Sequence, residues 1–197
     1  GLEGNALNIS DINKIKAQES QGIQSKGITT FAGGPGTYLQ SDAPIQVEAA
    51  WSAITPVTAH VPVVAVIDTG VDYNHEVFTD AGAMWSNAGE IAGNGIDDDG
   101  NGYVDDVRGW NFAYNNNNPM DDENHGTHVA GIVLGVTQDI FANPITAAKI
   151  KIMPLKFLDS NGSGATSNAI EAIHYAIANG ATIINAPWGG GSYSAAL

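Results

Sequence analysis

The stretch VPVVAVIDTG, residues 61–70, decides the fold that this sequence predicts. Its first seven residues are apolar and mostly β-branched, and Asp68-Thr69-Gly70 ends the run. A run of this kind is typical of a central strand that is buried on both faces of a parallel sheet. Asp68 then stands at the carboxyl end of a strand, where functional groups gather in open α/β sheets. A turn-forming Asp before Gly70 is the alternative interpretation.

Two more strands and a helix are predicted downstream. KIKIMPLKFL (149–158) and GATIINAPWGG (180–190) are strand candidates, and NAIEAIHYAIANG (168–180) between them has helical periodicity. A strand, a helix and a strand within about 40 residues form a βαβ unit, which implies parallel pairing and a right-handed crossover. We therefore expect an α/β fold with a mostly parallel sheet.

The helix carries its own start and stop signals. Either Ser167 or Asn168 can cap its N-terminus, and Asn179-Gly180 supplies a stop. Its apolar face is expected to carry three isoleucines at helical spacing: Ile170, Ile173 and Ile177.

Length and composition limit the classes of function. The 197 residues fit one domain of ordinary size, and the net charge of −14 argues against binding to nucleic acid. The chain has no cysteine, which excludes a disulfide scaffold and a thiolate nucleophile, and no apolar segment long enough to span a membrane. Residues 1–45 are turn-rich with weak periodicity, so we interpret them as an N-terminal arm or linker. Residues 46–197 are interpreted as the folded domain. No signal peptide is visible.

The stretch HGTHVAGIVLG, residues 125–135, predicts a second helix. Gly126, Ala130 and Gly131 have helical spacing and would let this helix pack closely against its neighbours. His125 would lie in its first turn, where the positive end of the helix dipole keeps the ring neutral and available as a base. His128, one turn deeper, is expected to be a packed, hydrogen-bonded structural histidine.

A zinc site is the alternative for these two histidines, with the neighbouring acids as further ligands of a metallohydrolase. The H-x-x-H spacing is poor for zinc, because helical metal pairs usually lie at i and i+4, and no third soft ligand follows. A base that moves protons is therefore the favoured hypothesis for His125.

Taken together, VAVIDTGVDYNH and HGTHVAGI resemble the first two catalytic blocks of the subtilisin-like serine proteases, the subtilase family. IKIMPLKFLDSNGSG and IEAIHYAIANGATIINAPWGGGSYS match the family as well, so the resemblance runs from about Gln46 to Leu197. It implies a three-layer α/β/α fold, incomplete at the C-terminus, and a secreted serine endopeptidase.

The resemblance also implies roles for individual residues. Asp68 would orient His125, which would take the proton from a serine hydroxyl and return it to the leaving amine. Two extended segments would hold the backbone of a polypeptide substrate like neighbouring strands. They comprise Gly162, Ser163 and Gly164 on one side, and Trp188 and Gly189 on the other.

The family pattern is not complete in this sequence. The G-T-S block that carries the nucleophile and the Asn of the oxyanion hole are both absent, and Pro187 stands where the family usually has Ser. Ser192 and Ser194 lack the strand-to-helix context of a nucleophile. We therefore expect a truncated catalytic domain without protease activity of its own. We also expect self-association through residues 181–188, because a buried-type strand would become an edge.

An acidic loop, GNGIDDDGNGYVDD (93–106), carries the second signal. Nine of the 21 acids lie between Glu90 and Glu123, against one base there. Oxygen donors recur at the spacing of an EF-hand loop as far as its ninth position, with Arg108 in place of the usual final Glu. The sequence predicts a Ca²⁺ site, with a disordered acidic turn as the alternative. The expected ligands are Asp97, Asp99, Asn101, the Tyr103 carbonyl, Asp105 and Asp106.

These observations leave three hypotheses. The first is part of a calcium-stabilised serine endopeptidase that acts on polypeptides. The second is a pseudoprotease or peptide-binding module on the same scaffold. The third is the metallohydrolase that uses both histidines.

Overall fold

Strand β2 (Val63–Asp68) forms the interior of a four-stranded sheet, as its apolar run predicts. The computed structural model describes residues 22–25, 61–138 and 150–190, with the backbone alone at 22–25 and 136–138. Within these ranges the strand order is β3-β4-β2-β6, and every pairing is parallel. The flanking strands are β3 (Trp110–Asn111), β4 (Lys151–Lys156) and β6 (Ile183–Asn185).

The register brings the carboxyl ends of β2 and β4 together. Val63 pairs with Lys151 at one end, and Asp68 pairs with Lys156 at the other. Residues 64–68 of β2 and 152–156 of β4 are all buried, so both strands lie inside the molecule. The polar residues that end these strands, Asp68 and Lys156, are therefore shielded from solvent.

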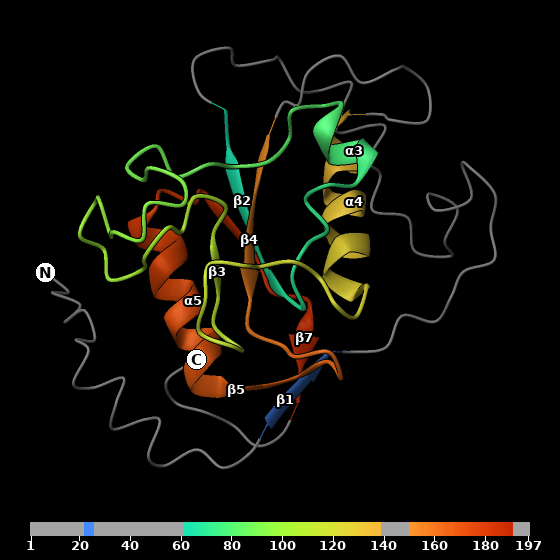
Figure 1. Ribbon diagram of the computed structural model, residues 1–197. Coiled ribbons are helices and arrows are strands. Elements are labelled where there is room, and N and C mark those ends of the chain that lie inside the picture. The colour runs from blue at the N-terminus through green and yellow to red at the C-terminus, as the bar shows by residue number, and fades with distance from the viewer. Residues whose placement is uncertain (1–21, 26–60, 139–149, 191–197) are drawn as a thin grey trace, which may run out of the picture.

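Helices cover both faces of the sheet (Figure 1). Helix α4 (His125–Gln138) packs against the face that carries Val64 and Val66. Helix α5 (Thr166–Ala178) packs against the opposite face, which carries Ala65 and Ile67. The alternation of side chains along β2 thus supplies two separate cores. The three-layer α/β/α fold, with its mostly parallel sheet, is confirmed.

Helix α5 differs in two details from the sequence prediction. It begins at Thr166, and the N-cap residue is Ala165 without a side-chain hydrogen bond, so neither predicted cap is correct. Ile170 is buried, but Ile177 is 63% exposed. The buried stripe of the helix is centred on small alanines that allow close approach to the sheet, and Ile177 lies on its flank. The predicted stop is correct, because Gly180 adopts φ +77°.

The predicted strand at 180–190 is two short strands, β6 and β7 (Trp188–Gly189). Among the described residues β6 is an edge of the main sheet, and β7 belongs to a second sheet with the order β5-β1-β7. Strand β5 comprises Ser163–Ala165 and strand β1 comprises Gly22–Ser25. A short helix, α3 (Glu76–Thr79), follows the turn after β2. No helix in the described part of the chain is long and apolar enough to cross a membrane.

Candidate active site

Asp68 and His125 form a buried pair between the end of β2 and the start of α4. The Nδ1 atom of His125 lies 2.7 Å from Oδ1 and 2.9 Å from Oδ2 of Asp68. Asp68 is 0% exposed and His125 is 6% exposed. The contact between these two side chains that the sequence predicts is present.

The first turn of α4 is held by side chains on both sides of it. Three backbone N–H groups of this turn have no carbonyl partner within the helix, and each donates to a side-chain oxygen. His125 N donates to Glu123 Oε2 at 2.8 Å, Gly126 N to Thr69 Oγ1 at 2.9 Å, and Thr127 N to Asp121 Oδ2 at 2.9 Å. The bond to Thr69 fixes the histidine-bearing helix directly to the turn that follows Asp68.

Asp121 is the central acceptor of this network. Its carboxylate accepts hydrogen bonds from the hydroxyls of Thr69 and Thr127 and from the backbone N–H groups of Glu123, Asn124 and Thr127. Burial raises the pKa of Asp121, but these hydrogen bonds outweigh it, so its pKa lies below the ordinary value. Asp121 is therefore bound as an anion at the positive end of α4.

For the pKa of Asp68, the effect of burial outweighs the effect of the hydrogen bonds. Burial raises its pKa above the ordinary value, against the lowering effect of the His125 side chain and of the Thr69 N–H, which donates to Oδ1 at 2.6 Å. A buried carboxylate with these two donors can hold the imidazole in one orientation. Nδ1 of the imidazole then carries the proton that faces Asp68, and Nε2 is left as a hydrogen-bond acceptor.

Two expectations about α4 are wrong. His128 is exposed rather than packed, because the helix turns it away from the sheet, and the buried residues of this turn are Val129 and Ala130. A Cβ at Gly131 would meet nothing within 4 Å, so this glycine is not needed for close packing. At Gly126, in contrast, a Cβ would clash with the carbonyl oxygen of Gly70. Of these two glycines, only Gly126 in the first turn therefore marks a close backbone approach.

The two segments expected to bind substrate lie on either side of one extended strand. Gln24 of β1 pairs with Ser163 of β5 on one side and with Gly189 of β7 on the other, and both pairings are antiparallel. Figure 1 shows β1 in blue between β5 and β7. Strand β1 comes from the predicted N-terminal arm, and the rest of that arm lies outside the described residues. Strands β5 and β7 are therefore the two edges of a slot that is occupied by the extended backbone of β1.

Both edges of this slot are anchored to the main sheet. The indole Nε1 of Trp188 donates to the carbonyl of Ile67 at 2.7 Å, and its ring lies 4.8 Å from that of Phe157. On the other edge, a Cβ at Gly164 would clash with the Phe157 carbonyl oxygen, so only glycine permits this approach. The slot is thus fixed beside the carboxyl ends of β2 and β4.

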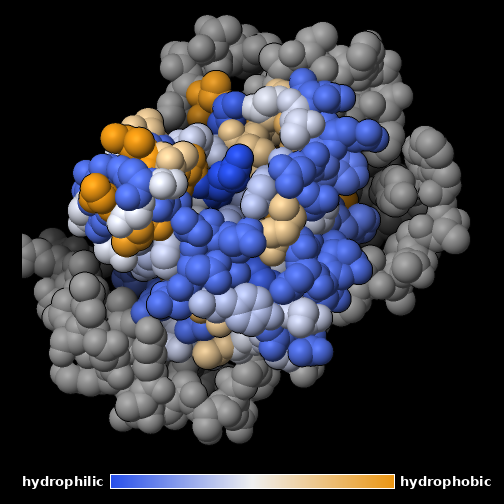
Figure 2. All heavy atoms as spheres, viewed as in Figure 1, coloured by the Kyte–Doolittle hydropathy of each residue, from blue (hydrophilic) through white to orange (hydrophobic). Residues whose placement is uncertain are grey.

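The acidic loop is ordered by its own carboxylates. Asp97 accepts hydrogen bonds from the N–H groups of Asn101 and Gly102. Asp105, which has φ 56°, accepts from Asn94 and Gly95 in the same way. The alternative of a disordered turn does not describe this loop. Figure 2 shows a mostly hydrophilic face, with apolar side chains gathered over this loop, where Ile91 and Ile96 are exposed.

Two acids of the loop and one just before it converge, and they are only partly the predicted set. Oxygen atoms of Glu90, Asp99 and Asp106 all lie within 4.8 Å of one another. Glu90 is not among the predicted ligands, because it lies outside the EF-hand spacing. Within the described ranges, Asp97, Asp105 and both histidines of α4 are outside this group. An all-carboxylate donor set of hard oxygens fits a divalent cation such as Ca²⁺.

The convergent group is tied to the α5 side of the fold. Asn87 Nδ2 donates to both Asp99 and Asp106, and the Tyr175 hydroxyl donates to the buried Asp106 at 2.5 Å. Burial, with the charges of Glu171 and Asp106, raises the pKa of Tyr103 to about 12. The Tyr103 ring packs edge-on against Tyr175. The loop is therefore joined to α5 through both polar and aromatic contacts.

Comparison with known proteins supplies independent findings. Residues 60–197 match the model of the subtilase family. The chain is 48% identical over 83 residues to a cell wall-associated protease of Bacillus subtilis (strain 168), a match that covers 42% of this chain and 9% of that protein. It is 36% identical over 122 residues to a thermophilic serine proteinase of Bacillus sp. (strain AK1), a match that covers 62% of this chain and 24% of that protein. It is 32% identical over 127 residues to thermitase of Thermoactinomyces vulgaris, a match that covers 64% of this chain and 37% of that protein. The chain thus spans less than two fifths of the length of each of these relatives.

Proposed function

This chain belongs to the subtilase family, and we propose that it is the N-terminal part of the catalytic domain of a serine endopeptidase. Asp68 and His125 are two members of an Asp-His-Ser triad. The observation that carries the proposal is the contact of 2.7 Å between His125 Nδ1 and the buried Asp68 carboxylate. The relatives named as a protease and as a serine proteinase support the same reaction class.

The chemistry follows from the orientation of the imidazole. With Nδ1–H donated to Asp68, Nε2 of His125 accepts the proton of a serine hydroxyl and later returns it to the leaving amine. Asp68 stabilises the imidazolium that forms in between, and its burial keeps water from competing for the Nδ1 proton. A buried pair of this kind performs general acid–base catalysis at neutral pH.

The substrate is a polypeptide bound as an added strand between β5 and β7. The placement of β1 in this slot supports that binding mode, because an extended backbone already pairs with both edges there. Ser163 and Gly164 lie on one edge, with Gly162 just before it, and Trp188 and Gly189 lie on the other. The same pairing favours a second candidate function, a peptide-binding module that recognises extended segments without cleaving them.

The chain by itself is proposed to be inactive. Nucleophile and base act as a unit, and loss of the serine from such a unit reduces kcat by roughly 10⁶-fold. The sequence has no G-T-S block. The complete enzyme therefore supplies the serine and the oxyanion donor from a segment other than residues 1–197.

A calcium ion is proposed at the acidic loop. Glu90, Asp99 and Asp106 would hold it, and the Asn101 side-chain amide donates hydrogen bonds to the last two. The bound cation would neutralise the clustered carboxylates and stabilise the loop against α5. It takes no part in the chemistry at His125. We place the protein outside the cell, as the name of the cell wall-associated relative suggests.

One experiment separates the two candidate functions. The natural full-length protein is assayed with a fluorogenic peptide, alongside His125→Ala and Asp68→Ala. We expect hydrolysis that falls by roughly 10⁴-fold or more in either variant. A full-length protein that binds peptide without turnover would favour the binding module. Turnover by residues 1–197 alone that His125→Ala abolishes would contradict the proposed inactivity.

A further inference from the structure

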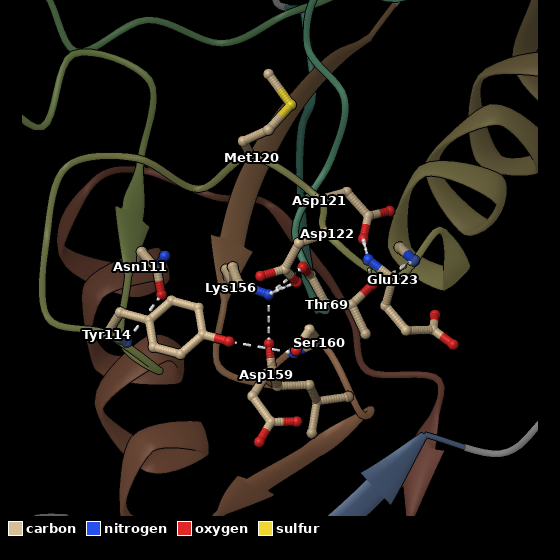
Figure 3. Close-up of polar contacts among 12 residues, drawn as sticks. Thr69, Asn111, Tyr114, Met120, Asp121, Asp122, Glu123, Lys156, Asp159 and Ser160 are labelled. Atoms are coloured by element: carbon tan, nitrogen blue, oxygen red, sulfur yellow. Dashed lines mark hydrogen bonds and ion pairs between the residues drawn. The ribbon is translucent and has the colours of Figure 1, made fainter.

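Lys156, the last residue of β4, has a fully buried side chain beside the proposed active site (Figure 3). Its ammonium group donates to the carbonyl of Thr69 at 2.6 Å, to the carbonyl of Leu158 at 2.7 Å and to Asp122 Oδ1 at 2.6 Å. The face of the Tyr114 ring lies 5.4 Å from the same nitrogen. An ammonium has three N–H donors, and all three are used here.

A buried lysine is costly unless its charge is paired and its donors are satisfied. The acceptors of Lys156 come from three separate segments: the turn after β2, the turn after β4 and the loop that leads to His125. Leu158 and Thr69 follow the paired residues of the two central strands. The ammonium therefore joins the ends of both strands to the loop before α4.

Thr69 transmits this restraint to the catalytic pair. Its N–H donates to Asp68, its hydroxyl accepts from Gly126 N, and the same hydroxyl donates to Asp121. Its carbonyl is held by Lys156. Every polar group of Thr69 is thus engaged, and the bonds of its N–H and hydroxyl restrain Asp68 and the first turn of α4.

We propose that Lys156, through its ion pair with Asp122, is a positioning residue that sets the geometry of the Asp68–His125 hydrogen bond. This inference rests on the proposed function and adds a residue to it. Among the described residues, no hydrogen bond or ion pair joins Lys156 to the imidazole or to the Asp68 carboxylate. It acts by fixing Thr69 on one side and the loop that carries Asp122 on the other.

The test uses proton NMR of residues 1–197. A proton held in a short, buried hydrogen bond between His125 Nδ1 and Asp68 resonates far downfield and exchanges slowly. We expect Lys156→Met to abolish or markedly broaden this resonance and to accelerate amide exchange at Thr69 and Gly126 by about tenfold or more. Exchange in the interior of β2 should stay slow. A merely structural role would accelerate exchange throughout the sheet without a selective effect on the histidine proton.

Two further variants make the result specific. Lys156→Arg keeps the charge and several donors, so it should restore the downfield resonance at least in part. Lys151→Met is the matched control, because Lys151 begins the same strand and its ammonium contacts the Gly82 carbonyl at the far end. It should leave the resonance unchanged.

Asp122→Ala tests the proposed role of the Lys156–Asp122 ion pair if Lys156→Met fails to fold. The side chain of Asp122 is 39% exposed, so its removal should be tolerated. We expect a broadened histidine resonance and faster exchange at Gly126. A wild-type spectrum in this variant, or in a folded Lys156→Met, would overturn the inference and leave the proposed function intact. Absence of the downfield proton from the wild-type protein would instead contradict the proposed function.

Discussion

Gly126 of helix α4 lies against the carbonyl oxygen of Gly70, just past the end of strand β2. This contact, together with the bond from Gly126 N to Thr69, brings the helix so close to the turn that His125 reaches Asp68. The separation of the two proposed catalytic side chains is therefore set by a backbone-to-backbone approach that only glycine permits.

The first prediction concerns this approach. Gly126→Ala places a methyl group against Gly70 and also within 3.0 Å of the Asp68 Cβ, so we expect overpacking to lower the free energy of unfolding by about 1–3 kcal/mol. Urea denaturation of residues 1–197 measures the change. Gly131→Ala is the matched control in the same helix. Since its Cβ meets open space, it should raise the free energy by about 0.5–1 kcal/mol. Equal effects of the two substitutions would contradict this account.

The second prediction concerns Asp121. Its pKa is lowered in the folded state, so its carboxylate contributes stability that is present above the unfolded value of about 3.9 and is lost as the pH falls through the folded value. We expect Asp121→Asn to lower the free energy of unfolding at neutral pH by about 1.5–3 kcal/mol. The asparagine side chain has one acceptor oxygen in place of two, and its NH₂ group would face N–H and O–H donors that now bind the carboxylate. The difference from wild type should shrink as the pH falls from about 5 toward the folded pKa.

Asp68→Asn provides the contrast for that experiment. Burial raises the pKa of Asp68, so its ionised form destabilises the fold above the folded pKa, and this effect is relieved as the pH falls through it. We expect Asp68→Asn to keep the thermal midpoint at neutral pH or to raise it. A large loss of stability in this variant would show that the hydrogen bonds of Asp68 outweigh its burial.

The third prediction concerns the proposed calcium site. Ca²⁺ at about 100 times its dissociation constant should stabilise the chain by about 2.7 kcal/mol, and EGTA should reverse the gain. Glu90→Gln should abolish this response, because Glu90 belongs to the convergent group. Asp98→Asn is the control from the same loop. Its carboxylate binds Ile91 N and Asn94 Nδ2 outside that group, so the response to calcium should persist. A melting curve unaffected by calcium and by EGTA would refute the site.

The fourth prediction concerns strand β6. Ile183 and Ile184 are 53% and 37% exposed on this edge strand, which invites pairing with a second copy of the chain. We expect concentration-dependent association in light scattering, and Ile183→Lys should weaken it by roughly tenfold or more. Ile132→Lys is the control, since Ile132 is exposed to a similar degree on α4, away from the edge. A monomer at high concentration would argue against association through β6.

The α/β class, the central strand and the two central helices could be read from residue patterns because each is a local property. A short, continuous, β-branched apolar run is typical of a strand buried on both faces, and the start of α4 follows from His125 and the small residues after it. The N-terminal limit of α5 is not predicted by a capping residue, because the helix begins at Thr166 directly after strand β5 without a side-chain cap. The prediction of a packed His128 is wrong, because the period of the helix does not reveal which side of α4 faces the sheet.

By itself, then, the sequence determined the fold class, the identity of the Asp68–His125 pair and the presence of a carboxylate-rich loop, since these depend on residue type and spacing. Tertiary structure alone decided which carboxylates converge, where β1 lies and how Lys156 is used. Glu90 and Asp106 are 16 residues apart, and Lys156 meets Thr69 across 87 positions. Such contacts depend on the parallel register of β2 and β4 and on the path of the loops, which no local pattern encodes.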